Sequence, residues 1–488
     1  MAVYESIADA IGGTPLFRLS RLGEGIAAPV YAKAEFLNIG GSVKDRAALS
    51  MVQAAEREGL LRPGGTIVEA TSGNTGIGLA IIGRQRGYRV VIGVSDRAAP
   101  EKSDILRAYG AEVVLAPTAL PKEHPDHLFH VVRRLTESIP GAWLANQYDN
   151  PANPDAHVRT TGPEIWEQTG GRVTHFVAGV GTGGTISGTG GFLKQASAGR
   201  VTVVGADPES SVFSGGDGSP YFVESIGHFV HPETLEDIWP ESYHRDVVDR
   251  FESVPDRESL LTARRMAREE GLLVGPSSGT AVAAALRVAR ELGPDDLVVV
   301  LLPDSGRSYL SKALSDDWLR DWGFLEEPRH LDDTEPTVRT ALGESPDHLG
   351  RFLTIPSTAT RTEALTLLHG DATDRTGHRG DATGTAVAPV VLTRPDRPFG
   401  LAATEILGSA DADAIETALA SGTAKPDEPL LDHLAPALPT IGIGQPLSTA
   451  LETLNALDAP AAIVLLNGRA TALIQRADLR PDPAWSDS

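Results

Sequence analysis

The chain has 488 residues, of which 41% are hydrophobic and 22% charged, an ordinary globular composition that argues against a disordered or fibrous protein. Its formal net charge of −22 argues against nucleic acid or an anionic membrane as a partner, because either would repel it. It contains no cysteine, which excludes disulfides, thiolate metal sites and cysteine nucleophiles, and its 13 histidines show no spacing typical of a protein-only metal site.

Residues from about 10 to 325 alternate short apolar runs with amphipathic helical patterns. Helical patterns include Asp45–Glu58 and Arg257–Glu270, and the apolar runs lie at 66–69, 89–94, 112–115, 175–178, 201–205 and 297–302. This alternation predicts an α/β fold with parallel sheet covered by helices on both faces. Ligands of such sheets bind beyond the carboxyl ends of the strands, so the loops there are the candidate sites.

The composition changes after Leu325, and residues 326–350 are polar with scattered prolines, which is typical of a linker. A β-α-β-β pattern then occurs twice. The first has strands at 353–356, 389–392 and 399–401, a helix at 361–368 and a loop insert at 369–385. The second has strands at 439–441, 462–466 and 472–474, a helix at 448–457 and an Asn467-Gly468 hairpin turn. We therefore predict a catalytic domain over 1–325, a linker over 326–350 and a smaller α+β module in two units, 351–425 and 426–488. A single α+β domain is the alternative.

The first candidate loop, 40–46, places Lys44 at the start of a predicted helix. A helix N-terminus favours anions, so a lysine there can have a lowered pKa and act as a nucleophile or form a Schiff base. The alternative is a solvated lysine with no function.

Three further loops are rich in glycine and hydroxyl residues, and each opens a predicted helix: 69–76, 179–185 and 275–279. Hydroxyls and free backbone N–H groups at helix starts can hold a carboxylate or a phosphate, although ordinary helix capping explains any one of them. Taken together, the loops suit a lysine, a phosphate and a substrate carboxylate. Pyridoxal 5′-phosphate, an aldehyde that carries a phosphate, accounts for all three.

The chain resembles the fold-type II pyridoxal-phosphate enzymes, and within them the cystathionine β-synthase family. This resemblance implies twisted parallel sheets in two subdomains. The two C-terminal units resemble the tandem CBS (Bateman) pair that often accompanies this family. The segments that carry the first resemblance are Gly13-Thr14-Pro15-Leu16, 38–46, 71–76, 147–154, 181–185 and 302–312.

The resemblance implies a role for each of several residues. Lys44 matches the lysine that forms the Schiff base, Asn74 the residue that hydrogen-bonds the cofactor's ring oxygen, and Ser277 the residue that faces the pyridine nitrogen. The phosphate loop matches Gly181, Thr182, Gly183, Gly184 and Thr185, and the residues that hold the substrate carboxylate match Thr71, Ser72, Thr75 and Gln147.

The resemblance also implies a β-replacement lyase that condenses serine, or an activated serine, with homocysteine to give cystathionine. Three alternatives remain open: a cysteine synthase or related enzyme that uses serine or O-acetylserine with sulfide or another nucleophile, a dehydratase, and a non-catalytic ligand sensor. We expect amino-acid and thiol substrates, a homodimer or homotetramer and, because the N-terminus lacks the pattern of a secretory signal, a cytoplasmic location.

Two departures from the family pattern bear on specificity and regulation. The family's Glu-Gly-Ile-Gly loop beside the substrate reads Glu224-Ser225-Ile226-Gly227 here. We expect the serine to narrow this loop and to change the choice of donor or acceptor. In the C-terminal units, the hydroxyl residues that usually precede the acids Glu405 and Asp478 are Ala402 and Gln475. An adenosyl effector at this module and a purely structural role both remain open. With no cysteine, we expect no haem.

Overall fold

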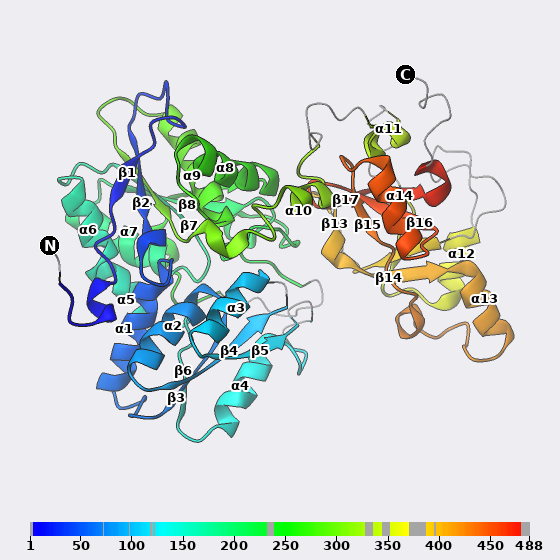
Figure 1. Ribbon diagram of the computed structural model, residues 1–488, viewed down its shortest axis with the longest axis horizontal. Coiled ribbons are helices and arrows are strands. Elements are labelled where there is room, and N and C mark those ends of the chain that lie inside the picture. Colours follow the sequence, from blue (N-terminus) through cyan, green and yellow to red (C-terminus); the bar gives the residue numbers. More distant parts are fainter. Residues whose placement is uncertain are drawn as a thin grey trace. The chain divides into compact units, whose positions relative to one another are not determined.

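The computed structural model describes residues 3–71, 73–96, 98–117, 120, 123–231, 239–326, 335–343, 352–369, 387–394 and 397–479. It divides into two compact units, 1–315 and 316–488 (Figure 1). Short apolar strands alternate with helices in the first unit, as the sequence predicts, and all six predicted apolar runs form strands.

A six-stranded sheet and a four-stranded sheet form the first unit. The larger sheet has the order β1 (Leu16–Arg18), β2 (Val30–Ala34), β10 (Val298–Leu302), β7 (His175–Gly179), β8 (Thr202–Pro208) and β9 (Arg250–Val254), all parallel except for the β1–β2 pair. The smaller sheet is fully parallel, in the order β5 (Glu112–Ala116), β4 (Arg89–Ser95), β3 (Thr66–Thr71) and β6 (Ala142–Leu144).

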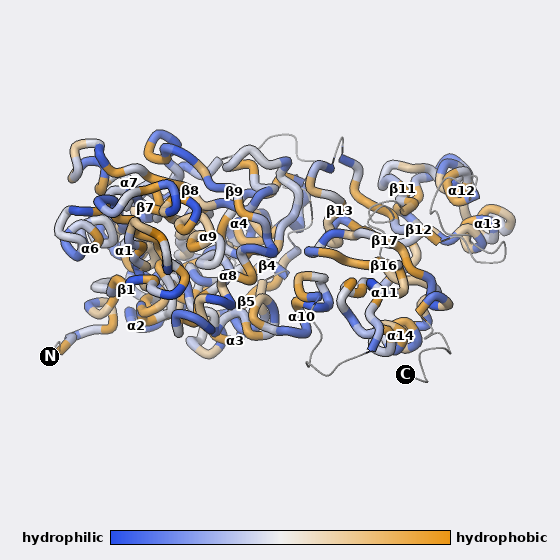
Figure 2. Tube along the Cα trace, turned by 90° about the horizontal axis from the view of Figure 1, so that it is seen from above, coloured by the Kyte–Doolittle hydropathy of each residue, from blue (hydrophilic) through white to orange (hydrophobic). Residues whose placement is uncertain are grey.

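Helices cover both faces of these sheets, which explains why the central strand β10 is apolar at every position. In β10, Val298 and Val300 pack with helix α9, whereas Val299 and Leu301 belong to a second core on the other face. The helices of this unit are α1 (Lys44–Arg57), α2 (Asn74–Gln85), α3 (Pro100–Ala108), α4 (Leu128–Ser138), α5 (Ala152–Arg159), α6 (Thr161–Gln168), α7 (Gly184–Ala196), α8 (Asp256–Glu269) and α9 (Pro276–Arg290). Figure 2 shows the hydrophobic segments that supply these cores along the chain.

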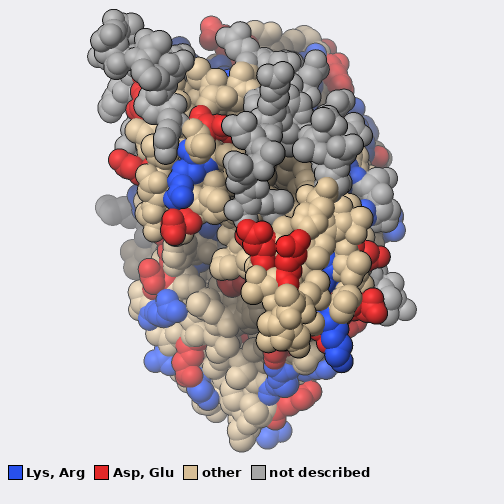
Figure 3. All heavy atoms as spheres, turned by 90° about the vertical axis from the view of Figure 1, so that its right-hand side faces the viewer, with Lys and Arg blue, Asp and Glu red and all other residues tan. Residues whose placement is uncertain are grey.

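The second unit contains a three-stranded and a four-stranded sheet. The first has the order β11 (Ile355–Pro356), β12 (Val387–Val391) and β14 (Ile406–Asp411); the second has the order β13 (Leu401–Ala402), β17 (Arg469–Gln475), β16 (Ala461–Leu466) and β15 (Thr440–Gly442). Its helices are α10 (Asp316–Asp321), α11 (Val338–Leu342), α12 (Arg361–His369), α13 (Ala412–Ala420) and α14 (Leu447–Ala456). On the face that Figure 3 shows, acidic and basic side chains are interspersed among uncharged ones.

The predicted elements of the second repeat are confirmed, including the hairpin turn, where Asn467 and Gly468 both have positive φ. In the first repeat, the run at 399–401 does not pair with the run at 389–392. The strand predicted at 399–401 forms β13 and pairs with β17 of the other repeat, and the antiparallel partner of β12 is β14. The buried Glu405 explains why β14, rather than β13, pairs with β12. Its carboxylate binds Arg394, Arg397 and the Ala402 N–H just before β14 begins.

Part of the predicted linker is also helical. Helix α11 forms there because Val338 is fully buried and Ala341 and Leu342 pack on the same core. The predicted loop insert lies outside the described residues apart from His369, which ends α12. The predicted domain bounds stay a prediction. Within the described ranges, every helix is too short or too polar to cross a bilayer.

Candidate active site

Lys44 is held at the first position of α1 by a backbone contact with the carboxyl end of β10. The Val43 N–H donates to the Pro303 carbonyl at 2.8 Å, and the Ser305 N–H donates to the Gly41 carbonyl at 3.1 Å. The chain therefore enters α1 directly from the edge of the large sheet where its parallel strands end, which is where such folds bind ligands.

The surroundings of Lys44 favour a neutral amine. Burial lowers its pKa, and the nearby Lys102 ammonium lowers it further, whereas the Asp304 carboxylate opposes the shift. A lysine with a lowered pKa is both a better nucleophile and an available base near neutral pH.

Asn74, the first residue of α2, is oriented by a buried carboxylate. Its Nδ2 donates to Asp304 Oδ2 at 2.7 Å, and the Tyr309 hydroxyl donates to the same oxygen at 2.5 Å. The preceding Gly73 has φ +130°, and a Cβ there would lie 2.6 Å from Lys102 Cδ, so only glycine fits. Asn74 is thus fixed from both sides of the cleft.

The loop between β7 and α7 forms a cup in which side chains would not fit. An added Cβ would lie 2.5 Å from the Ser225 carbonyl oxygen at Gly181, 2.3 Å from Tyr243 Cβ at Gly183, and 2.3 Å from Asn153 Oδ1 at Gly184. The cup opens α7, whose N-terminal N–H groups and dipole favour an anion. Thr182 accepts a hydrogen bond from Asn153 Nδ2 at 3.1 Å, and Thr185 lies 3.3 Å from His157 Nε2.

Ser277, in the first turn of α9, is fully buried, and its Oγ has no hydrogen-bond partner. A buried hydroxyl without a partner is costly, so its presence points to a ligand that supplies one.

A second group of polar side chains follows β3 and β6 of the smaller sheet. Thr75 Oγ1 donates to Gln147 Oε1 at 2.5 Å, and Thr71 Oγ1 accepts from the Gly73 N–H at 3.1 Å. The buried Glu69 accepts from the Gln147 N–H at 3.1 Å, and burial raises the pKa of Glu69 to about 8. Ser72 lies outside the described residues.

Two adjoining cavities connect these groups. The first is lined by Lys44, Asn74, Ser277, Gly181, Thr182, Gly183 and Thr185. The second, of about 490 Å³, is lined by Lys44, Asn74, Thr71, Thr75 and Gln147 among others. The structure therefore brings together all the predicted site residues that it describes, except that Gly184 contributes through the backbone of α7 and lines neither cavity.

The family model described as "Pyridoxal-phosphate dependent enzyme" matches residues 7–304 of the chain. The chain belongs to the pyridoxal-phosphate-dependent enzyme family. The match spans both sheets of the first unit, including every loop of the site.

Curated relatives in this family carry two different names. Cystathionine beta-synthase of Apis mellifera is 42% identical over 331 residues, which are 66% of this chain and 64% of the relative. A probable cysteine synthase of Bacillus subtilis is 44% identical over 330 residues, 67% of this chain and 100% of the relative. The chain thus spans about 64% of the length of the Apis mellifera enzyme.

Two solved structures are also similar to this chain. O-acetylserine-dependent cystathionine beta-synthase from Helicobacter pylori is 37% identical with a TM-score of 0.59, covering 64% of this chain and 99% of that one. A lysine-to-alanine mutant of O-ureido-L-serine synthase, bound to O-ureido-L-serine, is 38% identical with a TM-score of 0.60, covering 68% of this chain and 97% of that one.

The cofactor of this pyridoxal-phosphate-dependent family fits the residues present. The Ser277 hydroxyl without a partner and the cup that excludes side chains at Gly181 and Gly183 match a ring nitrogen and a phosphate, respectively. Lys44 lines the same cavity with a lowered pKa, as attachment of an aldehyde requires.

Sequence reasoning did not assign a role to Asp304, although it directly follows a buried apolar strand, a signal that would have found it. It also missed Lys102, which is fully buried, lies 4.4 Å above the Tyr309 ring and donates to Glu224 at 2.9 Å. Burial acts to lower the pKa of Lys102, but Glu224, Tyr309 and Asp304 together outweigh it and hold that pKa above its usual range. Lys102 therefore remains a cation next to the site.

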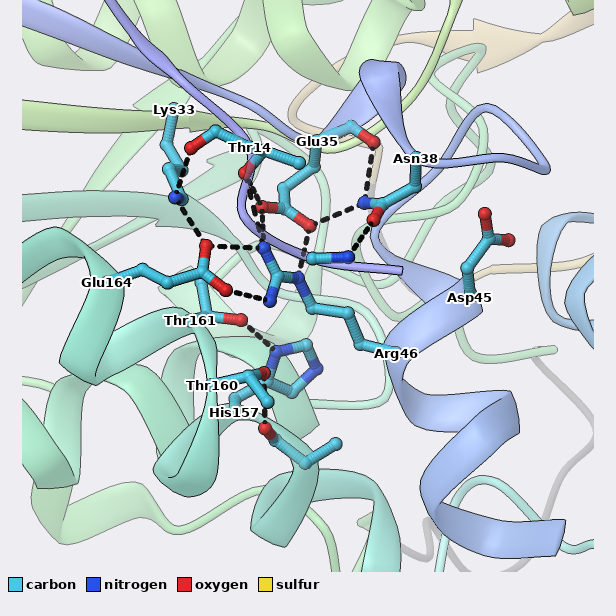
Figure 4. Close-up of polar contacts among 12 residues, drawn as sticks. Thr14, Lys33, Glu35, Asn38, Asp45, Arg46, His157, Thr160, Thr161 and Glu164 are labelled. Carbon is cyan, nitrogen blue, oxygen red and sulfur yellow. Dashed lines mark hydrogen bonds and ion pairs between the residues drawn. The ribbon is translucent and has the colours of Figure 1, made fainter. Parts of the chain in front are cut away.

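The N-terminal end of α1 is anchored by a buried ionic network centred on Arg46 (Figure 4). Arg46 Nε donates to Glu35 at 2.7 Å, and its Nη1 donates to Glu164 at 2.6 Å. Glu164 also binds Lys33 at 2.6 Å. Because Arg46 is two residues from Lys44, this network fixes the helix that presents the amine.

In the second unit, the structure bears on the predicted effector site. Glu405 is fully buried and binds Arg394 and Arg397. A ribose could reach this carboxylate only by displacing an arginine. Asp478, in contrast, is exposed.

Proposed function

We propose that this chain catalyses β-replacement on a serine-type amino acid, with homocysteine as the acceptor and cystathionine as the product. The observation that carries the proposal is that three groups line two adjoining cavities: the buried Lys44, the glycine-rich loop at 181–185, and the polar side chains of Thr71, Thr75 and Gln147. The names of the relatives support the same reaction class.

When bound, pyridoxal phosphate withdraws electrons from the substrate's Cα and so acidifies its proton. We assign Lys44 to attach the cofactor and then to take this proton, for which its lowered pKa suits it. The cup at 181–185 would hold the phosphate through backbone N–H groups and the two threonine hydroxyls, and Asn74 the ring oxygen.

Ser277 would face the ring nitrogen with a neutral hydroxyl. A hydroxyl cannot keep that nitrogen protonated as a carboxylate would, which favours loss of a Cβ substituent over build-up of charge at Cα. The substrate carboxylate would lie on Thr71, Thr75 and Gln147, with Ser72 as a further predicted contact.

The size and lining of the second cavity favour an acceptor larger than hydrosulfide. Its volume is about 490 Å³, and aromatic side chains including Phe129, Tyr148, Tyr221 and Trp239 line it. This is the range of pockets that enclose whole organic ligands. An amino-acid donor and a thiol amino acid fit such a space, whereas hydrosulfide would leave most of it to water.

The alternative is a cysteine synthase or related enzyme, and the Helicobacter pylori relative raises O-acetylserine as donor. Mass spectrometry of products from serine or O-acetylserine, each with homocysteine or sulfide, tests the proposal. Cystathionine as the main product supports it. Cysteine as the main product favours the alternative, and pyruvate formed without any thiol favours a dehydratase.

The homodimer or homotetramer, the cytoplasmic location, the absence of haem and the adenosyl effector stay predictions. Light scattering of the purified protein tests the first. Titration with S-adenosylmethionine tests the last, and the occupied Glu405 leads us to expect that the first repeat contributes no site.

A further inference from the structure

Ser225 lies in a backbone conformation that favours glycine. Its φ is +75°, in a region that residues other than glycine rarely adopt. Such strain persists only where the surroundings impose it, and it is concentrated at functional sites.

The surroundings of Ser225 do impose it. Just before it, Glu224 binds Lys102 at 2.9 Å and Lys312 at 3.1 Å. Just after it, the Gly227 N–H donates to the Val180 carbonyl at 2.7 Å. The segment is therefore clamped on both sides, and the direction of the Ser225 side chain is fixed.

The hydroxyl that this clamp fixes has no partner in the protein. Ser225 Oγ is buried, yet it forms no hydrogen bond. Ser225 also lines both cavities, a property that it shares with Lys44 and Asn74. Ser225 thus borders both the predicted cofactor space and the predicted substrate space.

We propose that Ser225 selects the donor amino acid by donating a hydrogen bond to the oxygen that the donor carries on its own Cβ. This inference rests on the proposed function. The residues proposed to hold the substrate carboxylate, Thr71 and Gln147, come from the smaller sheet. Ser225 follows β8 of the larger sheet and borders the same cavity. With the donor's amino group held beside Lys44 and its carboxylate on Thr71 and Gln147, the oxygen on the donor's Cβ is the polar group left to meet Ser225.

In this reaction the Cβ–O bond breaks, and the oxygen leaves with the bonding electron pair. Lys44 takes the Cα proton. With serine, the resulting Lys44 ammonium gives this proton to the departing oxygen, which leaves as water; with O-acetylserine, acetate leaves as the anion and needs no proton. Ser225 donates a hydrogen bond to that oxygen and transfers no proton.

Two variants separate the hydroxyl from the strain. Ser225→Ala removes the hydroxyl and keeps the unfavourable φ, whereas Ser225→Gly removes both. Ser219→Ala is the matched control, because Ser219 is buried, has an Oγ without a partner and lines neither cavity. Single-turnover consumption of serine, O-acetylserine and β-chloroalanine by the cofactor-loaded protein, without thiol, is the readout.

We expect both Ser225 variants to lose about three- to tenfold in the single-turnover rate constant for the oxygen donors, the contribution of one neutral hydrogen bond. β-Chloroalanine, whose chloride is a poor acceptor, should react at an unchanged rate. An equal loss on all three donors, or no loss, would overturn the inference. If Ser225→Ala does not fold, Ser225→Gly carries the same test. Failure of the unmodified protein to consume any donor would instead refute the proposed function.

Discussion

Replacing Arg46 by methionine should destabilise the first unit severely. The change removes the cation between Glu35 and Glu164 while keeping an apolar stem of similar length. Glu164 retains Lys33 at 2.6 Å, but Glu35, which is fully buried, keeps only the neutral donors Thr14 at 2.6 Å and Asn38 at 2.8 Å. A buried charge left without its partner typically costs about 3–5 kcal/mol.

This cost converts into a measurable shift of the melting temperature. An unfolding entropy of about 2.1 cal/mol/K per residue over the 315 residues of the first unit gives about 0.7 kcal/mol/K. The expected decrease in Tm is therefore roughly 4–8 °C. Scanning calorimetry of the full-length protein at one scan rate measures it.

A compensating variant makes the test specific. In Glu35→Gln/Arg46→Met the buried charge is absent, so this double variant should melt above Arg46→Met. A decrease below about 1 °C for Arg46→Met, set against the roughly 4 °C minimum expected, would refute the reasoning. So would a double variant that melts lower than the single one, because the penalty would then not come from the unpaired Glu35.

Three further predictions concern the site. Lys44→Ala should abolish activity and the visible absorbance of covalently attached cofactor; a retained band would contradict the assignment. Thr71→Val should raise the donor KM about three- to tenfold with unchanged cofactor retention, since one hydroxyl contact is lost, and equal loss of both would argue against its role. For Glu69, burial raises the pKa from 4.5 to about 8, so the folded state binds the carboxyl proton more tightly than the unfolded state does. The free energy of unfolding should therefore fall by up to about 5 kcal/mol as the pH rises from 4.5 to 8. Urea denaturation should show a smaller decrease for Glu69→Gln over this range, and identical pH slopes would refute the shift.

The loops of the site could be predicted from sequence because each follows an apolar strand and opens a helix. Local patterns of that kind predict both the fold class and the positions of Lys44, Asn74 and Ser277. Local patterns do not carry contacts between distant segments. The Asn74–Asp304 hydrogen bond joins residues 230 apart, and no periodicity around either one indicates the other.

The same limit explains which features of the second unit the sequence did not predict. The runs that form β12 and β13 are visible in sequence, but their partners depend on the buried Glu405 and its two arginines. Likewise, Val338, Ala341 and Leu342 are the apolar residues that mark α11 within a polar stretch. They stabilise this helix only by packing on a core formed by residues 441–479.

The pairing of β13 with β17 has a consequence for anyone who dissects this protein. A strand from the first repeat completes the sheet of the second, so neither repeat is a self-sufficient fragment. Cutting between them would uncover an unpaired strand edge on each piece, and such edges promote aggregation. The two repeats should therefore be expressed, deleted or transplanted only as one block.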